Sequence, residues 1–479
     1  MIPMTLSEIA SYAGSQLCYG KGDQSVPCIV TDSRKIVPGC LFVALRGENF
    51  DGHNFVSQAI EQGAVAAVVL ASFENPSHHP IIPVEDTLMA LGRIGSGYLK
   101  HHFTGLRKIA VTGSVGKTST KDMIAHVLGG AYNTCKTPMN FNNEIGLPMT
   151  LLGLEEGHEA LVAEMGMRGF GQIRYLTELV EQQITVITNI GTSHLELLGS
   201  RENILKAKME CCFAGLESRM NKPYRLIVNG DNDLLQDSKL LKKIAKEYGC
   251  SHLIVIPFGF GPKCAYRATD IRMEGRGMRF TLWCDRGHFS VDLPVLGEHN
   301  VYNALSAVAV ADACGIPVEH AIASLSTWGA GASRQKIVSY EGVTVIDDTY
   351  NASPESMRAS LSVLQQLPGE VKVAVLGDML ELGIASVQSH TEIGRMAGKI
   401  CSHLVAVGDL AEGYCQGYKL DGSSGDVCRF RVAEDAVPEV VRICKTARAQ
   451  GQRVAMLVKG SHSMHMERVT EGLAEYLNS

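Results

Sequence analysis

The segment Thr112-Gly-Ser-Val-Gly-Lys-Thr118 limits the possible folds of this chain more than any other feature. It follows the apolar run KIAVT, which predicts a strand, and precedes a pattern that predicts a helix from about Lys117 to Gly129. Small residues in such a turn let backbone N–H groups approach phosphate oxygens, Lys117 supplies a positive charge, and Thr118 can bind Mg²⁺. The alternative is a glycine-rich turn without a ligand, but chance rarely places Gly-Lys-Thr between an apolar strand and a helix. The segment therefore predicts an α/β domain that binds a nucleotide phosphate.

The loop is shorter than the standard GxxxxGK[ST] form, because Val111 occupies the position of the first glycine. It has the form TGxxGKT. The residues that we expect to contact the nucleotide are Gly113, Ser114, Val115, Gly116, Lys117, Thr118 and Ser119.

Length and composition exclude several classes of protein. A chain of 479 residues exceeds what one hydrophobic core supports, so two or three domains are expected. A net charge of −6 argues against a nucleic-acid or anionic-membrane partner. The first residues lack the basic and apolar regions of an export signal, and the longest apolar run, Ala64 to Ala71, is too short to cross a bilayer. The 14 cysteines include no CxxC pair, as is typical of reduced thiols, so we expect a cytoplasmic protein without membrane insertion.

Strand and helix patterns divide the chain into three expected domains, at residues 1–105, 106–332 and 333–479. The first is a small α/β unit. The second alternates strands and helices around the phosphate loop, which predicts a parallel sheet, and continues with short antiparallel strands between Cys264 and Leu293. A helix is expected from Tyr302 to Cys314. The third domain is predicted to be Rossmann-like, with four strands that each precede a helix: Val343 to Asp347, Val371 to Leu376, Leu404 to Val407 and Arg453 to Val458.

Two polar residues follow apolar strands of the second domain. Glu164 ends the run ALVAE, and His194 follows the run that ends near Asn189. Ligands bind at the carboxyl ends of parallel strands, so a carboxylate and an imidazole there are candidate ligands for Mg²⁺ or for groups around it. Taken singly, each is more often a polar loop residue whose hydrogen bonds are satisfied locally. Their position beside the phosphate loop favours a function.

Two segments of the chain resemble the Mur ligase family. The TGxxGK[ST] loop is shared by Mur ligases and the related folylpolyglutamate synthase, and the segment Thr137-Pro-Met-Asn140-Phe-Asn-Asn143 resembles the member that adds D-alanyl-D-alanine. The resemblance implies that Thr137, Asn140 and Asn143 lie near a muramoyl-peptide substrate. The alternative is an Asn-rich turn, because asparagine tolerates the left-handed conformation and forms local hydrogen bonds.

The same resemblance gives roles to the strand-end residues and to a lysine. Glu164 and His194 match the family's second metal site, and Lys208 matches a lysine that Mur ligases generally carry as a carbamate, which helps to hold Mg²⁺. Carbamylation would turn a cation into an anion, the sign needed beside a metal ion. Without the resemblance, Lys208 would be interpreted as a solvated surface charge. Lys206 points to a different face of the helix and is expected at the surface. The metal ligands implied are Thr118, Glu164, His194 and Lys208.

Further along the chain, Gly297-Glu-His-Asn300-Val-Tyr-Asn303 resembles the family segment whose two asparagines flank adenine. The spacing places both amides on one face of a helix, although Asn300 alone could be only a helix cap. Arg334 matches an arginine that contacts ATP phosphate in the family. Family members often have Gly-Arg here, so Ser333 departs from the pattern.

Three stretches of the third domain resemble the same member of the family. The first is Asp348-Thr-Tyr350-Asn351-Ala-Ser-Pro, where a strand ends in acidic residues before a helix, so that Asp348 could bind ribose hydroxyls. Tyr350 and Asn351 are placed on the nucleotide side with it. The other two stretches contain Asp378 and the pair Lys459 and Ser461, assigned to the dipeptide side, although His462 stands where the family commonly has arginine.

Two short motifs of the first domain resemble the uridine-diphosphate pocket of the peptide-adding Mur ligases. Ser33 follows a predicted strand in the sequence TDSR, and Asn54 lies at the start of a predicted helix in GHNF. A helix start suits a pyrophosphate. Both motifs are short and common, so their weight comes from their order ahead of the other motifs.

The resemblance runs through essentially the whole chain and implies an ATP-dependent amide ligase that adds D-alanyl-D-alanine to UDP-N-acetylmuramoyl-tripeptide through an acyl phosphate. The implied cofactors are ATP and Mg²⁺, the implied catalytic residues are Lys117, His194 and Lys208, and a monomer is expected. Hinge closure is expected near Leu106 and Ser333. One alternative is another ligase of the superfamily, which the stretches DDTYNASPESM and GDMLELG disfavour. The other is a nucleotide-switch protein, which would release no phosphate in response to both substrates together.

Overall fold

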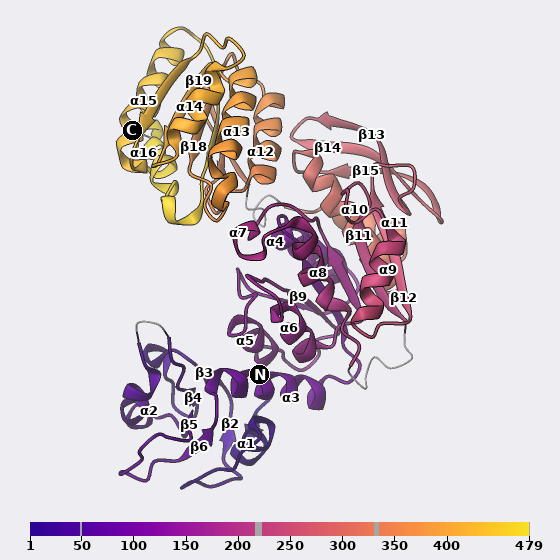
Figure 1. Cartoon of the computed structure of the whole chain (residues 1–479), viewed down its shortest axis with the longest axis vertical. Helices are drawn as coiled ribbons and strands as arrows, with labels where there is room; N and C mark the ends of the chain where they lie inside the picture. The colour runs from indigo at the N-terminus through magenta and orange to yellow at the C-terminus, as the bar shows by residue number, and fades with distance from the viewer. Residues whose placement is uncertain (48–49, 216–222, 330–334, 479) are drawn as a thin grey trace.

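The computed structural model describes residues 1–47, 50–215, 223–329 and 335–478. Most of its strands belong to three large sheets, and each of these sheets is built from a separate range of the sequence. Figure 1 shows the N-terminal sheet at the lower left, the C-terminal sheet at the upper left, and the central sheet joining them on the right. The predicted α/β class with three such units is confirmed. No helix of the described ranges is long and apolar enough to span a membrane.

The N-terminal sheet has four parallel strands in the order β3-β4-β5-β6. Their bounds are Ile29–Val30, Leu41–Val43, Ala66–Leu70 and Ile81–Val84. The sequence patterns did not predict β6, whose Pro83 is tolerated because this strand lies at the edge of the sheet. A short ribbon of β1 (Met4–Thr5) and β2 (Ser25–Val26) and the helices α1 (Leu6–Ala13), α2 (Val56–Glu61) and α3 (Thr87–His102) complete this part.

Helix α3 connects the N-terminal and central parts. It packs against α1 and β5 on one side and against α5 (Gly146–Leu152) and α6 (Gln172–Val180) on the other. Its fully buried Tyr98 accepts a hydrogen bond from the N–H of Ile2 and donates one to the carbonyl of Leu154. One hydrophobic cluster therefore runs from the N-terminal sheet through α3 into the central sheet.

The central sheet has nine strands in the order β15-β14-β13-β12-β11-β10-β7-β9-β8. Side chains alternate across it: Ile109 and Val111 of β7 (Arg107–Thr112) face α4 (Lys117–Gly129) and α10 (Glu298–Ala313), whereas Ala110 faces the α3, α5 and α6 side. The other strands are β8 (Thr134–Lys136), β9 (Ala160–Glu164), β10 (Ile184–Ile187), β11 (Tyr224–Asn229), β12 (Leu253–Gly259), β13 (Tyr266–Glu274), β14 (Gly277–Cys284) and β15 (Gly287–Leu293). The remaining helices of this part are α7 (Leu195–Leu198), α8 (Arg201–Met209), α9 (Ser238–Glu247) and α11 (Val318–Leu325).

The predicted change from parallel to antiparallel strands occurs at β13. Strand β13 pairs with β12 in parallel over a short stretch, and β14 and β15 then continue the same sheet in antiparallel pairs. The helix predicted from Tyr302 begins earlier, at Glu298, directly after Gly297 with its positive φ of 95°. Asn300 and Asn303 consequently lie in the first turns of α10, close to the phosphate loop.

The C-terminal sheet has six strands in the order β16-β17-β21-β18-β19-β20, and only the edge strand β16 is antiparallel. Four strands match the prediction: β17 (Val343–Asp348), β18 (Val371–Gly377), β19 (His403–Val407) and β21 (Val454–Lys459). The edge strands β16 (Lys336–Tyr340) and β20 (Asp426–Phe430) were not predicted, because edge strands are half exposed and lack a continuous apolar run.

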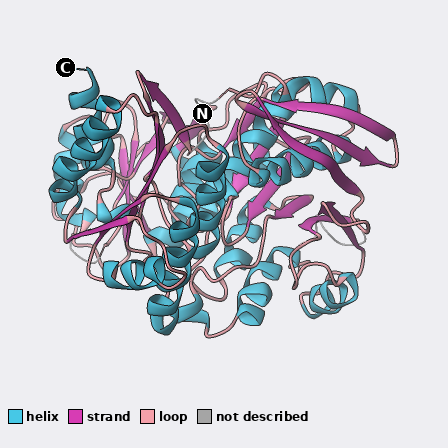
Figure 2. Ribbon diagram, turned by 90° about the horizontal axis from the view of Figure 1, so that it is seen from above, coloured by secondary structure: helices cyan, strands magenta, loops and turns pink. Residues whose placement is uncertain are grey.

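Helices lie over both faces of the C-terminal sheet, and Figure 2 distinguishes helices from strands by colour. Helices α12 (Pro354–Gln366), α13 (Ser386–Ile400) and α14 (Ala411–Lys419) share one hydrophobic cluster, and α15 (Ala433–Ala449) and α16 (Glu467–Asn478) lie over the other face. This is the predicted Rossmann-like arrangement. Helix α12 also lies next to the start of α10, where a Cβ added to Gly297 would be 2.8 Å from Val363.

Candidate active site

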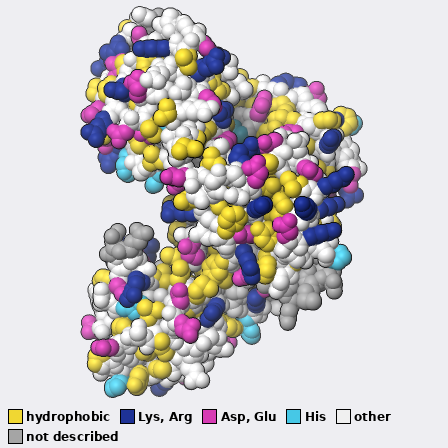
Figure 3. Space-filling model, in the orientation of Figure 1, with side chains coloured by type: hydrophobic (Ala, Val, Ile, Leu, Met, Phe, Trp, Pro, Cys, Tyr) yellow, Lys and Arg dark blue, Asp and Glu magenta, His cyan; other side chains and the backbone are white. Residues whose placement is uncertain are grey.

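A recess with a volume of about 630 Å³ lies between the central and C-terminal parts. Its central wall consists of the phosphate loop, the loop around His194 and the first turns of α10; its C-terminal wall consists of the loops after β17, β18 and β21. Figure 3 shows acidic and basic side chains mixed over the visible face, without a large patch of one sign. The predicted site residues that line the cavity are Ser114, Val115, Gly116, Lys117, Thr118, Ser119, Asn140, His194, Asn300, Asn303, Asp348, Tyr350, Asn351, Lys459 and Ser461.

Glycine and asparagine set the shape of the phosphate loop. A Cβ added to Gly113 would lie 1.9 Å from the hydroxyl oxygen of Thr188, so only glycine fits between β7 and β10. The side-chain oxygen of Asn189 accepts hydrogen bonds from the N–H groups of Ser114 and Val115, at 3.1 and 2.9 Å. Asn189, which follows β10, therefore holds the loop in place.

Lys117 lies across the phosphate loop. Its ammonium group donates hydrogen bonds to the carbonyls of Gly113 and Ser114, at 2.9 and 3.3 Å. The cation is thus placed where the oxygens of a bound polyphosphate would carry their negative charge.

Glu164 lies at the end of β9, almost completely buried behind the phosphate loop. One carboxylate oxygen accepts a hydrogen bond from the hydroxyl of Thr118 at 2.7 Å and is 3.7 Å from the ammonium of Lys121. The other accepts from the amide of Asn142 at 2.8 Å. A buried carboxylate beside a hydroxyl of the loop is the donor set that a hard cation prefers.

His194 and Lys208 lie on the opposite side of the phosphate loop from α10. Burial, with the positive charges of Lys208 and Lys117, lowers the pKa of His194 to about 4, so its imidazole is neutral at pH 7. Its Nδ1 is 3.2 Å from a carboxylate oxygen of Glu381 but forms no hydrogen bond with any described residue. A neutral imidazole with an unused nitrogen is suited to bind a metal ion.

Lys208 is only 2% exposed, whereas Lys206 on the same helix is exposed, as expected. Burial, followed by repulsion from Lys117, lowers the pKa of Lys208 well below its ordinary value. Its amine forms no hydrogen bond or ion pair with any residue in the described ranges. A buried lysine without a counterion is unusual, because burial of an unpaired charge is costly.

The four expected metal ligands fit a divalent cation in their chemistry, although they do not form a preassembled cage. The described residues contain no group of three His, Cys, Asp or Glu side chains close enough together to hold a metal ion. Glu164 and Thr118 are in contact, His194 has a free nitrogen, and Lys208 would become an anionic oxygen donor only as a carbamate.

The two asparagines of α10 lie beside the phosphate loop. Asn303 donates to the side-chain oxygen of Asn300 at 3.1 Å and accepts from the hydroxyl of Thr120 at 2.8 Å. Asn300 donates to the carbonyl of Leu296. Both amides are therefore fixed at the cavity edge. Between them and the C-terminal wall lies His299, which the sequence did not single out; burial lowers its pKa to about 4.

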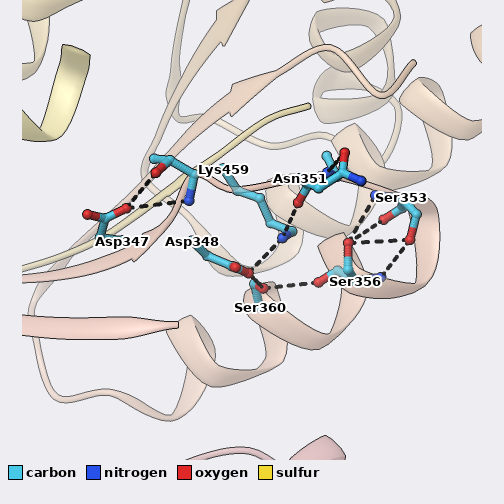
Figure 4. A network of polar contacts seen from close by, with 9 residues as sticks. Asp347, Asp348, Asn351, Ser353, Ser356, Ser360 and Lys459 are labelled. Carbon is cyan, nitrogen blue, oxygen red and sulfur yellow. Dashed lines mark hydrogen bonds and ion pairs between the residues drawn. The ribbon is translucent and has the colours of Figure 1, made fainter. Parts of the chain in front are cut away.

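An ion pair organises the C-terminal wall (Figure 4). The ammonium of Lys459, at the end of β21, is 2.7 Å from a carboxylate oxygen of Asp348, at the end of β17, and donates to the carbonyl of Asn351 at 2.8 Å. The hydroxyl of Ser360 donates to the same carboxylate at 2.6 Å. The ring of Tyr350 lies 5.6 Å from that of His462. Residues that sequence motifs assigned to nucleotide and to dipeptide are thus in direct contact.

Asp378 and Ser461 hold two loops of this wall together. The N–H of Ser461 donates to the carbonyl of Asp378, and the Ser461 hydroxyl accepts from the N–H of Leu380. The Asp378 carboxylate accepts from the N–H of Leu410, and burial raises its pKa. Ser461 lines the cavity, whereas Asp378 lies behind it.

Of the Asn-rich segment, only Asn140 reaches the cavity. Thr137 is completely buried, with its hydroxyl accepting from the N–H of Glu164 at 2.9 Å. The side chain of Asn143 accepts from the N–H groups of Ile145 and Gly146, just before and at the start of α5. The structure therefore brings Asn140 to the site and places the other two behind or beside it.

The two expected uridine-site residues lie far from this cavity, on the N-terminal part. Ser33 is half-buried at the start of a short helical turn, and Asn54 is exposed in the turn Gly52–Phe55 before α2. The remaining predicted residue, Arg334, lies outside the described residues, as does Ser333.

Two acidic residues that the sequence did not single out join the walls of the cavity. Glu355, in the first turn of α12, accepts hydrogen bonds from the N–H and the hydroxyl of Thr192, at 3.0 and 3.2 Å. Glu381 approaches His194. Both stand in the stretches DDTYNASPESM and GDMLELG, but the sequence does not show their contacts, because each contact joins segments far apart in the chain.

Comparison with known proteins agrees with this architecture. The model for the Mur ligase middle domain matches residues 111–311, that for the Mur ligase glutamate ligase domain matches residues 333–462, and that for the Mur ligase family catalytic domain matches residues 25–98. The chain is 37% identical to a UDP-N-acetylmuramoyl-tripeptide–D-alanyl-D-alanine ligase of Bacillus subtilis and 34% identical to one of Escherichia coli, covering 99% of each chain in both pairs.

Solved structures lead to the same assignment. A crystal structure of MurF from Acinetobacter baumannii superposes with a TM-score of 0.88 at 33% identity, covering 100% of this chain and 99% of that one. A structure of MurF ligase from Thermotoga maritima in complex with ADP superposes with a TM-score of 0.80 at 27% identity, covering 94% and 97%. The chain belongs to the Mur ligase family.

Proposed function

We propose that this chain is an ATP-dependent ligase that joins D-alanyl-D-alanine to UDP-N-acetylmuramoyl-tripeptide, giving UDP-N-acetylmuramoyl-pentapeptide, ADP and phosphate. One observation carries the proposal: a phosphate loop and the strand ends of a Rossmann-like sheet enclose one cavity between them. Relatives with this activity in their names align over the full length of the chain, which supports the choice of substrates.

The reaction has two steps. The terminal carboxylate of the tripeptide attacks the γ-phosphorus of ATP, so that an acyl phosphate forms and ADP leaves. The amine of D-alanyl-D-alanine then attacks the acyl carbon, a C–N bond forms, phosphate leaves, and the amine loses a proton. Negative charge concentrates on phosphate oxygens in both steps, so Lys117 and the N–H groups at the start of α4 provide electrostatic stabilisation.

The nucleotide would extend from α10 to the C-terminal wall. Asn300 and Asn303 present amide groups to the base, and Asp348 presents a carboxylate to the ribose. Tyr350 and Asn351 close this side of the cavity. Arg334 would contact phosphate, next to Gln335, which lines the cavity.

Thr118, Glu164 and His194 would hold Mg²⁺, with Lys208 as a further ligand. When bound, Mg²⁺ neutralises phosphate charge and acts as a Lewis acid. The chain's own residues prepare this site: Thr118 keeps Glu164 oriented, and burial keeps His194 neutral, with its Nδ1 free to accept a bond.

Lys208 would act as a carbamate. Burial lowers the pKa of Lys208 and so favours the uncharged amine, the form that adds CO₂ to give a carbamate and release a proton. In the carbamate, the side chain of Lys208 would no longer be an unpaired buried amine. It would instead bring a negative charge close to Lys117 and His194.

The remaining assignments concern the two substrates and the assembly. Ser33 and Asn54 would bind the uridine diphosphate, the Asn-rich segment the muramoyl-peptide, and Asp378, Lys459 and Ser461 the dipeptide side. Domains at 1–105, 106–332 and 333–479 would close about hinges near Leu106 and Ser333, the latter outside the described residues. We propose a cytoplasmic monomer.

The test is phosphate release measured with ATP, UDP-muramoyl-tripeptide and D-alanyl-D-alanine, each omitted in turn. Two tripeptides, ending in lysine or in diaminopimelate, are compared. Release that requires all three components supports the proposal. Release that does not depend on the dipeptide would contradict it.

A further inference from the structure

Lys121 is a buried cation for which the proposed reaction has no use. It lies in α4, one helical turn after Lys117, and is only 1% exposed. Lysine is rarely buried without partners. The ammonium of Lys121 is 3.5 Å from a carboxylate oxygen of Asp122 and 3.7 Å from one of Glu164.

The ammonium also binds the backbone of the Asn-rich segment. It donates hydrogen bonds to the carbonyls of Thr137 and Met139, at 2.7 and 3.3 Å. Met139 has a φ of 45°, in the left-handed region, which is unfavourable for a residue with a side chain. Lys121 therefore holds a conformation that the segment would not favour by itself.

Glu164 is attached to the same segment at two other points. Its N–H donates to the hydroxyl of Thr137, and its carboxylate accepts from the amide of Asn142. The second carboxylate oxygen accepts from Thr118 of the phosphate loop. Thr118 and Lys121 thus lie on one helix and both contact Glu164, while Lys121 and Glu164 each also contact the Asn-rich segment.

We infer that Lys121 is a positioning residue that couples the nucleotide site to the Asn-rich segment, and through Asn140 to the acceptor side of the cavity. A movement of α4 or of Glu164 when the nucleotide binds is transmitted to the backbone at Thr137 and Met139. The inference rests on the proposed function, because the acceptor that the segment would meet is the UDP-muramoyl-peptide.

The experiment measures the dissociation constant of UDP-muramoyl-tripeptide by calorimetry, with and without a non-hydrolysable ATP analogue and Mg²⁺. In the unmodified protein the analogue changes this constant by about fivefold or more, the usual range for coupled sites. In Lys121→Met the ratio falls towards one. Lys121→Arg, which keeps the charge and the donors, restores part of it.

Lys136→Met is the matched control. Lys136 pairs with the same Asp122 carboxylate, at 2.8 Å, but is exposed and makes no side-chain hydrogen bond or ion pair with residues 137–143 in the described structure, so the ratio stays unchanged. Asn142→Ala removes the other side-chain link to Glu164 at a half-buried position. This substitution should lower the ratio of the two dissociation constants by less than Lys121→Met does. If Lys121→Met does not fold, an unchanged ratio in Asn142→Ala would overturn the inference.

A folded Lys121→Met with unchanged coupling, or with lowered stability as its only defect, overturns the inference. So does an equal loss of coupling in Lys136→Met. Failure of the proposed function has a different signature: the unmodified protein would then bind no UDP-muramoyl-tripeptide and release no phosphate with it.

Discussion

The two walls of the cavity are built in different ways. Backbone geometry and buried amides fix the central wall, where Gly113 leaves room for β10 and Asn189 holds two N–H groups of the loop. The C-terminal wall is held by the ion pair of Asp348 and Lys459 and by hydroxyl groups around it. The shape of the central wall therefore does not depend on an ion pair. The C-terminal wall depends on the charges of Asp348 and Lys459, which line the cavity and can be reached by a substrate.

This difference suits a reaction in which phosphate transfer and amine attack follow one another. The phosphates need fixed donors, because electrostatic stabilisation is effective only when the donors are already in place. The wall that admits the second substrate must be able to move. The contacts between the walls include two polar ones, Glu355 with Thr192 and Glu381 with His194, and the apolar packing of α12 beside the start of α10.

The largest effect is expected from a substitution behind the central wall. Lys208→Ala should lower kcat for phosphate release by about a hundredfold or more, because it removes the group that is proposed to become an anion beside the metal site. The exposed Lys206→Ala is the control on the same helix and should leave kcat unchanged. Equal effects of the two substitutions would contradict the carbamate. Mass spectrometry under CO₂ offers a direct test, since the carbamate adds mass only in the unmodified protein and in Lys206→Ala.

The ion pair of the C-terminal wall should matter most for stability. Asp348→Asn leaves Lys459 buried without its counterion, which should lower the free energy of unfolding of this part by about 3 kcal/mol. Glu392→Gln, which breaks the exposed pair with Arg358, should cost less than about 1 kcal/mol. Urea unfolding followed by circular dichroism compares the two. A similar, small loss in both variants would show that the wall does not depend on the buried pair.

A smaller effect is expected on the pH dependence of stability, through His299 of the central wall. Burial lowers the pKa of His299 to about 4, with Asp348 opposing and Lys459 adding to the shift, whereas in the unfolded chain the imidazole has the ordinary histidine pKa of 6.5. Between these values the unfolded state binds more protons, so the stability of the native protein falls as the pH falls. His299→Gln should remove roughly 1–3 kcal/mol of this loss between pH 6.5 and 4.

Urea midpoints at pH 7 and pH 4.5 measure the effect. The exposed His320→Gln is the control and should keep the pH dependence of the unmodified protein. If His299→Gln loses as much stability on acidification as the control, His299 does not remain neutral inside the fold.

Sequence patterns predicted the central wall better than the C-terminal wall or the joint between them. The phosphate loop, Glu164 at the end of β9 and the asparagines of α10 each carry a local signal: a strand end, a glycine spacing or a helical period. Structure was needed for contacts between residues far apart in the chain. Lys121 resembles any polar residue of α4 until its contacts with Glu164 and the backbone of Thr137 are seen.

Burial explains where the sequence motifs and the cavity differ. Thr137 belongs to a recognisable motif, but its side chain is used inside the protein to hold Glu164. Asp378 is likewise used to connect two loops. A motif marks residues that a fold requires around a site without separating those that touch the ligand from those that support them. The edge strands β16 and β20 were missed for a related reason, because exposure weakens their apolar pattern.

The smallest effect is expected at the joint between the walls. Glu355→Ala removes an acceptor for the N–H and hydroxyl of Thr192, an interaction that should contribute about 1 kcal/mol to closure. The KM for ATP should therefore rise by about two- to tenfold, with a smaller change in kcat.

Glu319→Ala is a matched control, since Glu319 also lies in the first turn of a helix, α11, but is exposed. The effect of a negative charge on a helix start is the same in both variants. If both variants have the KM of the unmodified protein, the C-terminal wall is held closed without Glu355, and the joint depends on the packing of α12 against the start of α10.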